Sequence, residues 1–472
     1  MQDELELHGQ WYIPRTDETF SGFLFIHREK KQIYLQIVSV AKDGEFMAPM
    51  KAWGHCDLIK GEINTGGSIL LYDCNIGSLN NRIGQNTTAI VEVGAAFWHL
   101  DVDNADKLCF RKVDVDFGDI VEWSGMCSYE ADASGDKFVW NRKPEVCFAI
   151  HENLCLRIVP YQGKISMWSF QKEYRLSQGV AMTLEYQTDA AWEQIRLDIS
   201  TLSDLITFGM NRAVYLEKLE YYHTSHKDED IFPDYIHPVE AFVGDRIEGK
   251  TIPGKNWEWL FSMQDLITED CRCLRNWYNK YEKLKPVVEL YEAAHRFRGI
   301  SAEMLFLNLV QALETYHARF VCDSLKQYIT MVDVFLRETY SLQEGEDWNE
   351  HVLAYRNLLI AQDEKKSKSI HLKSRLGYLF LANFKYVFSY LDYRKDEFIQ
   401  LVLDTRNYYT HYAEEKKDRT FPAEKMPYVN GILMGVLQYY LLQEIGINNE
   451  RIEYVVGNQM ERVMRSFDMF GT

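Results

Sequence analysis

The sequence predicts a two-part α+β protein, in which a mainly antiparallel β domain of sandwich or barrel type precedes an all-α helical bundle. The first observation is a series of short runs rich in Val, Ile, Tyr, Phe and Trp, which turn clusters separate up to about residue 200. The second is that apolar residues from Trp257 onward recur at the i, i+3, i+4 and i+7 spacing of amphipathic helices. The third is the length of 472 residues, which is enough for two or three domains.

Changes in composition along the chain set the expected domain boundaries. We predict a β domain at residues 1–225, an irregular connector at 226–256 and a helical region at 257–472, whose core covers about 300–472. A helix from Ile199 to about Leu219 is expected to close the β domain. The connector is predicted to be irregular because it contains several glycines together with Pro233, Pro238 and Pro253.

The β domain is predicted from runs whose polarity partly alternates. The expected strands are Gly9–Pro14, Gly22–His27, Gln32–Val38, Ala89–His99, Val146–Val159 and Val180–Tyr186. Four tryptophans could form a platform for a ligand, although filling of the core between sheets is the favoured alternative; they are Trp98, Trp123, Trp140 and Trp168. One group of polar residues could suggest a metal, but a flexible turn is the preferred interpretation; it comprises His223, His226, Asp228, Glu229 and Asp230.

The helical region is predicted as a succession of amphipathic helices. Trp257–Leu284 forms the first, and Pro286 ends it or begins the next. Ala302–Phe320 follows, with Ser301 as its N-cap. Further helices are expected at about Asp396–Glu415, Met426–Ile445 and Arg451–Phe467, with a charged turn at Glu414–Arg419.

The composition restricts the class of protein. Nine scattered cysteines lack the paired spacing of a zinc site and indicate a reducing compartment. The sequence does not begin with a basic region followed by an apolar run, and no apolar stretch is long enough to span a bilayer, so we expect a cytoplasmic protein. The net charge of −18 argues against broad, non-specific binding to nucleic acids but leaves room for a small basic site.

The expected helix around residues 404–412 carries polar side chains that suit phosphodiester chemistry. At about 100° per residue, Arg406, Asn407, Thr410 and His411 share one sector of this helix. Among the 13 histidines, only His411 has an arginine five residues before it. A solvated helix face, or pairing of Arg406 and His411 with carboxylates, is the alternative interpretation. The opposite, buried stripe is predicted to consist of Phe398, Leu401, Val402, Thr405, Tyr408, Tyr409 and Tyr412.

These polar side chains fit cleavage of RNA by its own 2′-hydroxyl group. The reaction needs a base for the 2′-hydroxyl proton and an acid for the leaving 5′-oxygen, and histidine, with an unperturbed pKa of about 6.5, can serve as either. Arginine is permanently charged and binds phosphate through two parallel hydrogen bonds, which stabilises the charge that builds up in the transition state. This scheme requires no metal and no other cofactor.

The segment Arg406–His411, with the sequence Arg-Asn-Tyr-Tyr-Thr-His, resembles the Arg-polar-x3-His signature of HEPN ribonucleases. Three further segments resemble the ApeA-like branch of HEPN proteins. Leu307–His317 is similar to the first HEPN helix of that branch, Ile370–Leu376 to its middle helix, and His8–Pro14 to the opening of its N-terminal domain. The resemblance spans most of the chain and implies that the helical bundle is a HEPN domain.

The resemblance also suggests supporting residues. It places the helix that contains Glu314 next to the motif helix, so Glu314 could orient His411 or Arg406, or it could be a surface carboxylate or part of a structural salt bridge. A locally basic stretch before and within the middle helix could bind RNA phosphates, although a solvated loop is the favoured alternative. The candidate RNA ligands in this stretch are Lys366, Lys368 and Lys373.

The activity that the resemblance implies is that of a metal-independent endoribonuclease in anti-phage defence, which cuts host RNA on infection and halts growth, with tRNA as a candidate substrate. Two HEPN domains are expected to pair in a homodimer or higher oligomer, so that Arg406 and His411 of both copies line one cleft. A phage-derived activator could act through the β domain, and neither membranes nor DNA are expected as partners. The alternatives are a non-catalytic HEPN module that binds RNA or a protein, and a ligand-binding β domain on a helical oligomerisation scaffold.

Overall fold

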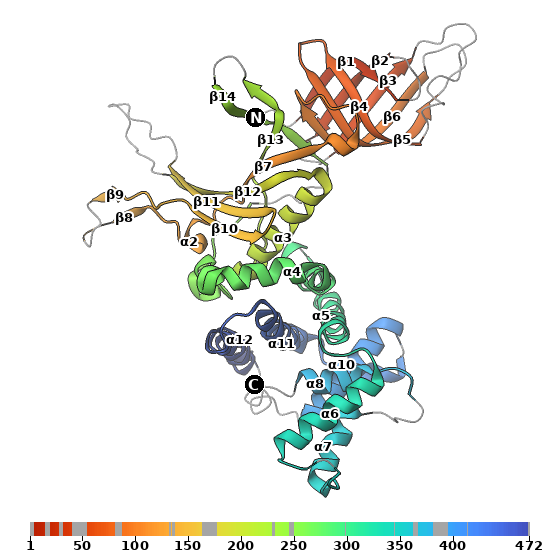
Figure 1. Cartoon of the computed structure of the whole chain (residues 1–472). Helices are drawn as coiled ribbons and strands as arrows, with labels where there is room; N and C mark the ends of the chain where they lie inside the picture. Colours follow the sequence, from red (N-terminus) through yellow and green to blue (C-terminus); the bar gives the residue numbers. More distant parts are fainter. Residues whose placement is uncertain are drawn as a thin grey trace. The chain divides into compact units, whose positions relative to one another are not determined.

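The structure is a computed structural model, and the chain divides into two compact units (Figure 1). The first unit comprises Met1–Ile206 and Val214–Asn256, and the second comprises Thr207–Ala213 and Trp257–Thr472. The residues that the structure describes are 4–14, 19–27, 32–39, 54–80, 87–131, 134, 137–162, 177–228, 232–244, 250–297, 299–343, 345–361, 367–380, 395–412 and 414–470.

The first unit begins with a closed antiparallel barrel. Its strands are β1 (Glu4–Tyr12), β2 (Thr19–His27), β3 (Gln32–Ser39), β4 (Gly54–Ile63), β5 (Ser68–Asn80) and β6 (Thr87–Trp98). They pair in the order β6-β3-β2-β1-β4-β5, and an additional pairing of β5 with β6 closes the ring. Alternate residues of each strand point into one apolar core, where the Trp11 indole N–H donates to the Gly22 carbonyl at 3.2 Å. Closure leaves few unpaired strand edges.

A second sheet follows in the same unit. Its strands are β7 (Cys109–Asp116), β10 (Val146–His151), β11 (Leu154–Gln162), β12 (Gln178–Ala191), β13 (Lys218–Asp228) and β14 (Phe232–Val239), in the order β10-β11-β12-β7-β13-β14. The smaller elements are α2 (Val121–Ser124) and a hairpin of β8 (Tyr129–Ala131) and β9 (Phe138–Trp140). Helix α3 (Trp192–Met210) follows β12 directly. Trp192 packs on Phe97 of the barrel and on Tyr221 of β13, at centroid distances of 4.8 and 5.0 Å, so both sheets share an aromatic core.

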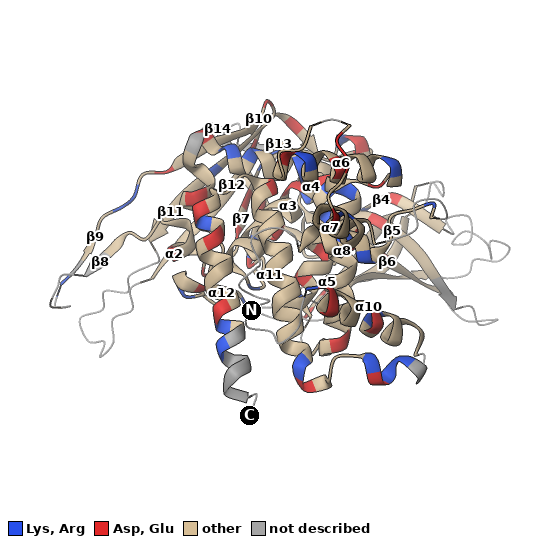
Figure 2. Cartoon of the chain, turned by 90° about the horizontal axis from the view of Figure 1, so that it is seen from below, with Lys and Arg blue, Asp and Glu red and all other residues tan. Residues whose placement is uncertain are grey.

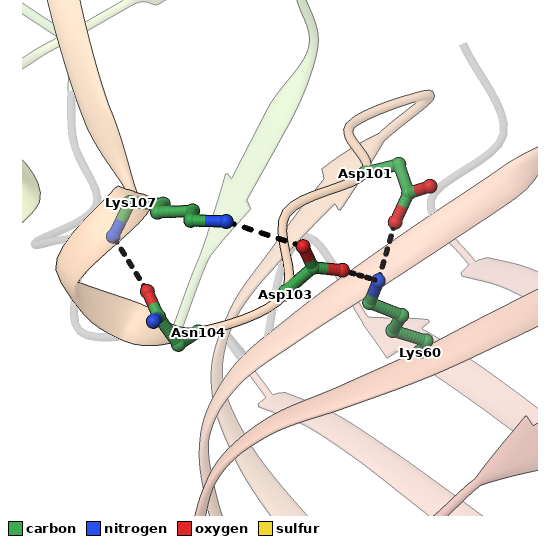
Figure 3. Close-up of polar contacts among 5 residues, drawn as sticks. All are labelled: Lys60, Asp101, Asp103, Asn104 and Lys107. Carbon is green, nitrogen blue, oxygen red and sulfur yellow. Dashed lines mark hydrogen bonds and ion pairs between the residues drawn. The ribbon is translucent and has the colours of Figure 1, made fainter.

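A small polar network fixes the connection between the barrel and the second sheet (Figure 3). Lys60 of β4 donates to Asp101 at 2.6 Å and to Asp103 at 3.1 Å. Asp103 also accepts from the Lys107 ammonium at 3.2 Å, and the Asn104 side chain caps the short helix η1 (Ala105–Lys107). Because the two carboxylates are largely exposed, solvent screens these ion pairs and they contribute little to stability.

The structure corrects two predictions in the region after residue 190. The range 226–256 is not simply an irregular connector, because it contains β14 and β15 (Ala241–Val243), and β15 pairs with β6. Pro233 and Pro238 occur in β14, which lies at the edge of its sheet, and edge strands are where prolines are tolerated in sheets. The predicted helix from Ile199 to about Leu219 begins at Trp192 and ends at Met210.

The second unit is helical. Its main helices are α4 (Met263–Arg296), α5 (Ala302–Tyr316), α6 (Leu325–Thr339), α7 (Glu350–Ile360), α8 (Leu372–Leu379), α10 (Lys395–His411), α11 (Met426–Ile445) and α12 (Asn449–Phe470). Helix α11 packs against α4, α5 and α12, and it is apolar around almost its whole circumference, as a central helix must be. A second apolar cluster joins α6, α7 and the turn before α8. The predicted order of a β-rich region and a helical bundle is confirmed.

The second unit is discontinuous in sequence, because the residues at the end of α3 belong to it. Asn211 accepts a hydrogen bond from the Tyr291 hydroxyl at 2.8 Å and from the Gln438 amide at 3.2 Å. Phe208 packs against Tyr291 and Trp277, with ring centroids 5.4 and 6.1 Å apart. Thr207–Ala213 is therefore an integral part of the helical core.

The predicted start of α5 and both predicted ends of α11 agree with the structure. Ser301 caps α5, since its side chain accepts from the Met304 N–H at 3.2 Å, and α11 has the predicted bounds. The prediction for α4 was wrong at both ends, because the helix begins at Met263 and runs through Pro286 to Arg296. A proline removes one helical hydrogen bond, but the buried side chains around it keep this helix intact.

Candidate active site

Helix α10 is held in one rotational setting by its buried face. Phe398, Val402 and Thr405 are buried, and the Thr405 hydroxyl accepts a hydrogen bond from the Phe421 backbone N–H at 3.0 Å. Phe421 belongs to the segment that returns along α10, and its ring lies 5.5 Å from that of Phe398. These contacts determine which side of α10 remains open.

The four motif residues lie on that open side. Arg406 and Asn407 are partly exposed, whereas Thr410 and His411 are exposed. Arg406 Nη1 donates to Asn407 Oδ1 at 3.3 Å, and the Thr410 hydroxyl donates to the Arg406 carbonyl at 2.7 Å. No described residue forms a hydrogen bond or ion pair with the His411 ring. The imidazole therefore has both nitrogens available to a ligand within this part of the chain.

The residues of the predicted stripe are buried or partly buried along most of α10, but the last of them is exposed. Tyr408 and Tyr409 are partly buried, but Tyr412 is 70% exposed. The helix ends at His411, and Tyr412 has a φ of 49°, which turns the chain away from the helical path. Ile399, which the predicted stripe omits, is buried.

A row of polar residues continues the motif face toward the start of α10. Gln400, Asp404, Asn407 and His411 are spaced i, i+4, i+7 and i+11, which places them on one side of a helix. The Gln400 amide donates to Asp404 at 3.1 Å. Two lysines join this row from other elements: Lys373 of α8 donates to Gln400 at 3.2 Å, and Lys416 of the 3-10 helix η4 (Glu414–Arg419) lies 3.9 Å from Asp404. In Figure 2, Lys and Arg positions are interspersed with Asp and Glu positions along the helical ribbons.

Two family comparisons cover both units. The model of ApeA N-terminal domain 1 matches residues 6–277, and the model of Apea-like HEPN matches residues 307–451. The first match alone covers more than half of the chain. The chain belongs to the ApeA-like HEPN family. No curated protein and no solved structure gives a significant match.

The HEPN match contains the whole of α10, so the motif of this ApeA-like protein lies inside its HEPN domain. HEPN domains are generally ribonucleases, and the match therefore assigns the helical unit to a family of nucleases and defence proteins.

The structure describes two of the three lysines that were predicted to bind RNA. Lys373 lies on the motif face, Lys368 is exposed in the turn before α8, and Lys366 lies outside the described residues.

In this ApeA-like protein, no polar contact joins Glu314 to the motif among the described residues. Its partly buried side chain forms no hydrogen bond or ion pair with Arg406 or His411 in the described chain. Burial and, after it, the nearby Glu303 carboxylate raise the pKa of Tyr409, so the motif end of α10 lies close to the first turn of α5. Glu303 and Glu314 are eleven positions apart, which is about 16 Å along a helix. The orienting role of Glu314 remains a prediction.

The ApeA-type unit contains a cavity that the sequence does not predict. Its volume is about 760 Å³, and strands β3, β5 and β6 together with α3 provide its walls. The polar groups around it include Gln36, Asn75, Asp73, Glu92 and Arg196. These residues are far apart in sequence and meet only through the pairing of β3, β5 and β6, so no local pattern reveals them.

The structure shows how three of the four predicted platform tryptophans pack. Trp123 is fully buried and Trp98 packs against the barrel core, which agrees with the core-filling alternative. Trp140 packs on Tyr129, and Trp168 lies outside the described residues. His223 is a buried residue of β13 against Phe110, so the predicted flexible turn is wrong there.

The described residues contain no group of three His, Cys, Asp or Glu side chains placed to hold a metal. None of the described helices has the length and apolarity that a membrane crossing requires.

Proposed function

We propose that this ApeA-like HEPN protein is a metal-independent endoribonuclease, which cleaves RNA by attack of the substrate's own 2′-hydroxyl. The observation that carries this proposal is the exposed His411 ring, without a described partner, on the same open face as the Arg406 guanidinium. A histidine removes or supplies the proton, and the arginine binds the phosphoryl oxygens. The products are a 2′,3′-cyclic phosphate and a 5′-hydroxyl.

Each motif residue has a separate role in this scheme. Arg406 stabilises the charge that develops on the scissile phosphate, and loss of one such preorganised donor typically costs about two to three orders of magnitude in rate. Asn407 accepts from Arg406 and holds the guanidinium in place for the phosphate. Thr410 is bonded to the helix backbone through the Arg406 carbonyl, so it supports the end of α10.

The reaction needs two proton-transferring groups, and each chain supplies one His411. We propose that two copies of the HEPN domain pair, so that one His411 acts as the base and the other as the acid across a single phosphodiester. The partly exposed Arg406 of each copy then faces the same phosphate. A homodimer is thus the smallest assembly that completes the site.

The surroundings of the motif favour a restricted RNA substrate. Lys373 and Lys416 join the motif face through hydrogen bonding and charge, and they provide contacts for neighbouring phosphates. The chain as a whole carries a net charge of −18, which repels RNA that does not fit this local site. A tRNA with an accessible loop satisfies both conditions, with Lys366 and Lys368 as additional contacts.

We further propose that the activity serves anti-phage defence in the cytoplasm, where cleavage of host RNA stops growth before phage production. The β unit senses the trigger, and its cavity of about 760 Å³ offers a place for a small activating ligand. That cavity also favours the second candidate function, in which the HEPN domain binds RNA or a protein without cleavage while the β unit binds a ligand.

Sequencing of RNA ends after induced expression tests the proposal. The wild type is expected to produce new 5′-hydroxyl ends, whereas His411→Ala and Arg406→Ala should remove them while the protein remains folded. His351→Ala on α7 and Arg465→Ala on α12 are matched controls, because both side chains are exposed in the same unit away from the motif. Cleavage that persists in both motif variants contradicts the assigned chemistry, and cleavage that EDTA abolishes indicates a metal enzyme instead.

A further inference from the structure

We infer that Tyr412 is a substrate-binding residue that stacks on an unpaired base beside the scissile phosphodiester. The inference rests on the proposed ribonuclease function and adds a feature of the substrate to it. It concerns the position directly after His411, where the structure shows an exposed aromatic ring on an unusual backbone.

The exposure of Tyr412 is not explained by folding. Its side chain is 70% exposed, which is the highest value for any large hydrophobic side chain in the described part of the chain. Its φ of 49° lies in the left-handed region, which glycine adopts easily and a tyrosine adopts only at an energetic cost. A ring that buries little surface, on a backbone that suits glycine, contributes little to the stability of the bundle. Such outliers are concentrated at functional sites.

The ring is nevertheless held by its neighbours. Tyr412 lies edge-to-face on Tyr408, with ring centroids 5.9 Å apart at 62°, and Tyr408 lies edge-to-face on Tyr409, with centroids 5.1 Å apart at 70°. The Tyr412 backbone N–H also donates to the Tyr408 carbonyl at 2.5 Å. The three rings form a tyrosine cluster (Tyr408, Tyr409 and Tyr412), which orients the outermost ring and leaves much of its surface open to a ligand.

The chemistry of such a ring selects a base rather than a phosphate. Bases that are not paired stack on the faces of exposed tyrosines, and this stacking tolerates any base because every base has a π-face. Tyr412 directly follows His411, and consecutive Cα atoms are about 3.8 Å apart, so the two side chains are close enough to contact neighbouring nucleotides of one bound strand. Bases inside a duplex are already stacked on each other and are not available. The substrate class is therefore RNA with an unpaired nucleotide at the cleavage position.

The first measurement is binding in the His411→Ala background, which prevents cleavage. The probe is an RNA hairpin series with 2-aminopurine at successive loop positions, together with a fully paired duplex that carries the same label. We expect quenching at one or two loop positions and none in the duplex. Adding Tyr412→Phe should preserve the quenching, and adding Tyr412→Ala should abolish it and weaken binding by roughly 5- to 150-fold. Tyr454→Ala on α12 is the control, because its side chain is 64% exposed on another helix.

The second measurement is cleavage of the same unlabelled hairpins. Tyr412→Ala is expected to lower kcat/KM mainly through KM, and Tyr412→Phe should restore most of that loss because it keeps the ring. Tyr454→Ala should remain within about twofold of the wild type. Cleavage by His411→Ala at the wild-type rate would overturn the proposed function itself. Inactive His411→Ala with fully active Tyr412→Ala would overturn the stacking role alone. A change of oligomeric state in Tyr412→Ala with unchanged hairpin binding would assign the ring to a protein interface and also overturn it.

Discussion

Arg406 Nη1 donates a hydrogen bond to Asn407 Oδ1 at 3.3 Å on the partly exposed side of α10. The two residues are adjacent in sequence, so the contact joins side chains that leave the helix about 100° apart. The amide is a neutral acceptor, and it can orient the guanidinium without neutralising it. The charge of Arg406 therefore remains available for a phosphate.

Replacing the amide by a carboxylate tests this relationship. Asn407→Asp is expected to form an ion pair with Arg406 that competes with the RNA phosphate, and to lower kcat/KM by about two orders of magnitude. Asn407→Ala should have a smaller effect, since it removes the orienting group but keeps the charge available. Initial rates on RNA check both variants. Asn357→Asp, at an exposed position of α7, controls for the added negative charge, and an Asn407→Asp enzyme as active as the wild type would refute the orienting role.

The lysines beside the motif are expected to act through charge alone. The double variant Lys373→Ala/Lys416→Ala should weaken binding to single-stranded RNA of any sequence, and it should reduce the slope of log K against log salt by about 1.4, at about 0.7 for each phosphate contact. Titrations of the His411→Ala protein at several salt concentrations measure this slope. Lys326→Ala on α6 is the control at an exposed position. An unchanged slope would remove both lysines from the RNA path.

The hydrogen bond from the Phe421 N–H to Thr405 should be important for stability, because both groups are buried. Thr405→Val keeps the shape of the side chain but leaves the N–H without its acceptor, which is expected to cost about 1–3 kcal/mol. Thr330→Val, whose exposed hydroxyl bonds its own helix, should change stability by less than about 0.5 kcal/mol. Thermal unfolding followed by circular dichroism compares the two, and equal melting temperatures would show that this bond does not hold α10.

The stability of the helical unit should decrease in acid because of His317. Burial and, after it, the Arg375 guanidinium lower the pKa of His317 to about 3, whereas an unfolded histidine has a pKa of about 6.5. The unfolded chain therefore binds the proton more tightly, so the stabilisation by neutral His317 is complete above about pH 6.5 and is lost as the pH falls toward 3.

His317→Gln is expected to flatten the dependence of the unfolding free energy on pH in this window, even though it lowers stability near neutral pH. Melting temperatures between about pH 4 and pH 7 measure the effect. His351→Gln, at an exposed site on α7, should keep the wild-type slope. If both variants follow the wild-type curve, His317 is not the group responsible.

Features that depend on neighbouring residues in the sequence were predicted well, whereas features that depend on tertiary packing were not. Helix α11 had the predicted ends because its own residues define them, with Pro427 in the first turn and Gly446 in the left-handed conformation at the end. Pro286 and Pro233 were misleading, because packing around α4 and the edge position of β14 decide whether a proline interrupts the element.

In the candidate site, too, features set by local sequence were predictable and features set by packing were not. The sector of Arg406 and His411 followed from helical geometry, and the structure places it on the open side of α10. The exposure of Tyr412 depends on a single φ angle at the helix end, and the position of Glu314 relative to the motif depends on how α5 packs. The cavity of the first unit depends on strand pairing across distant segments, so no helix or strand pattern could predict it.

The segment Thr207–Ala213 has a practical consequence for dissecting this protein. A gene fragment that starts at Trp257 would encode every HEPN helix yet omit Phe208 and Asn211, leaving the Tyr291 hydroxyl and the Gln438 amide without their shared acceptor inside the bundle. Such a fragment would be prone to aggregate for reasons unrelated to toxicity. Separating nuclease from sensor therefore requires a fragment that keeps the end of α3, or two co-expressed pieces that reassemble around it.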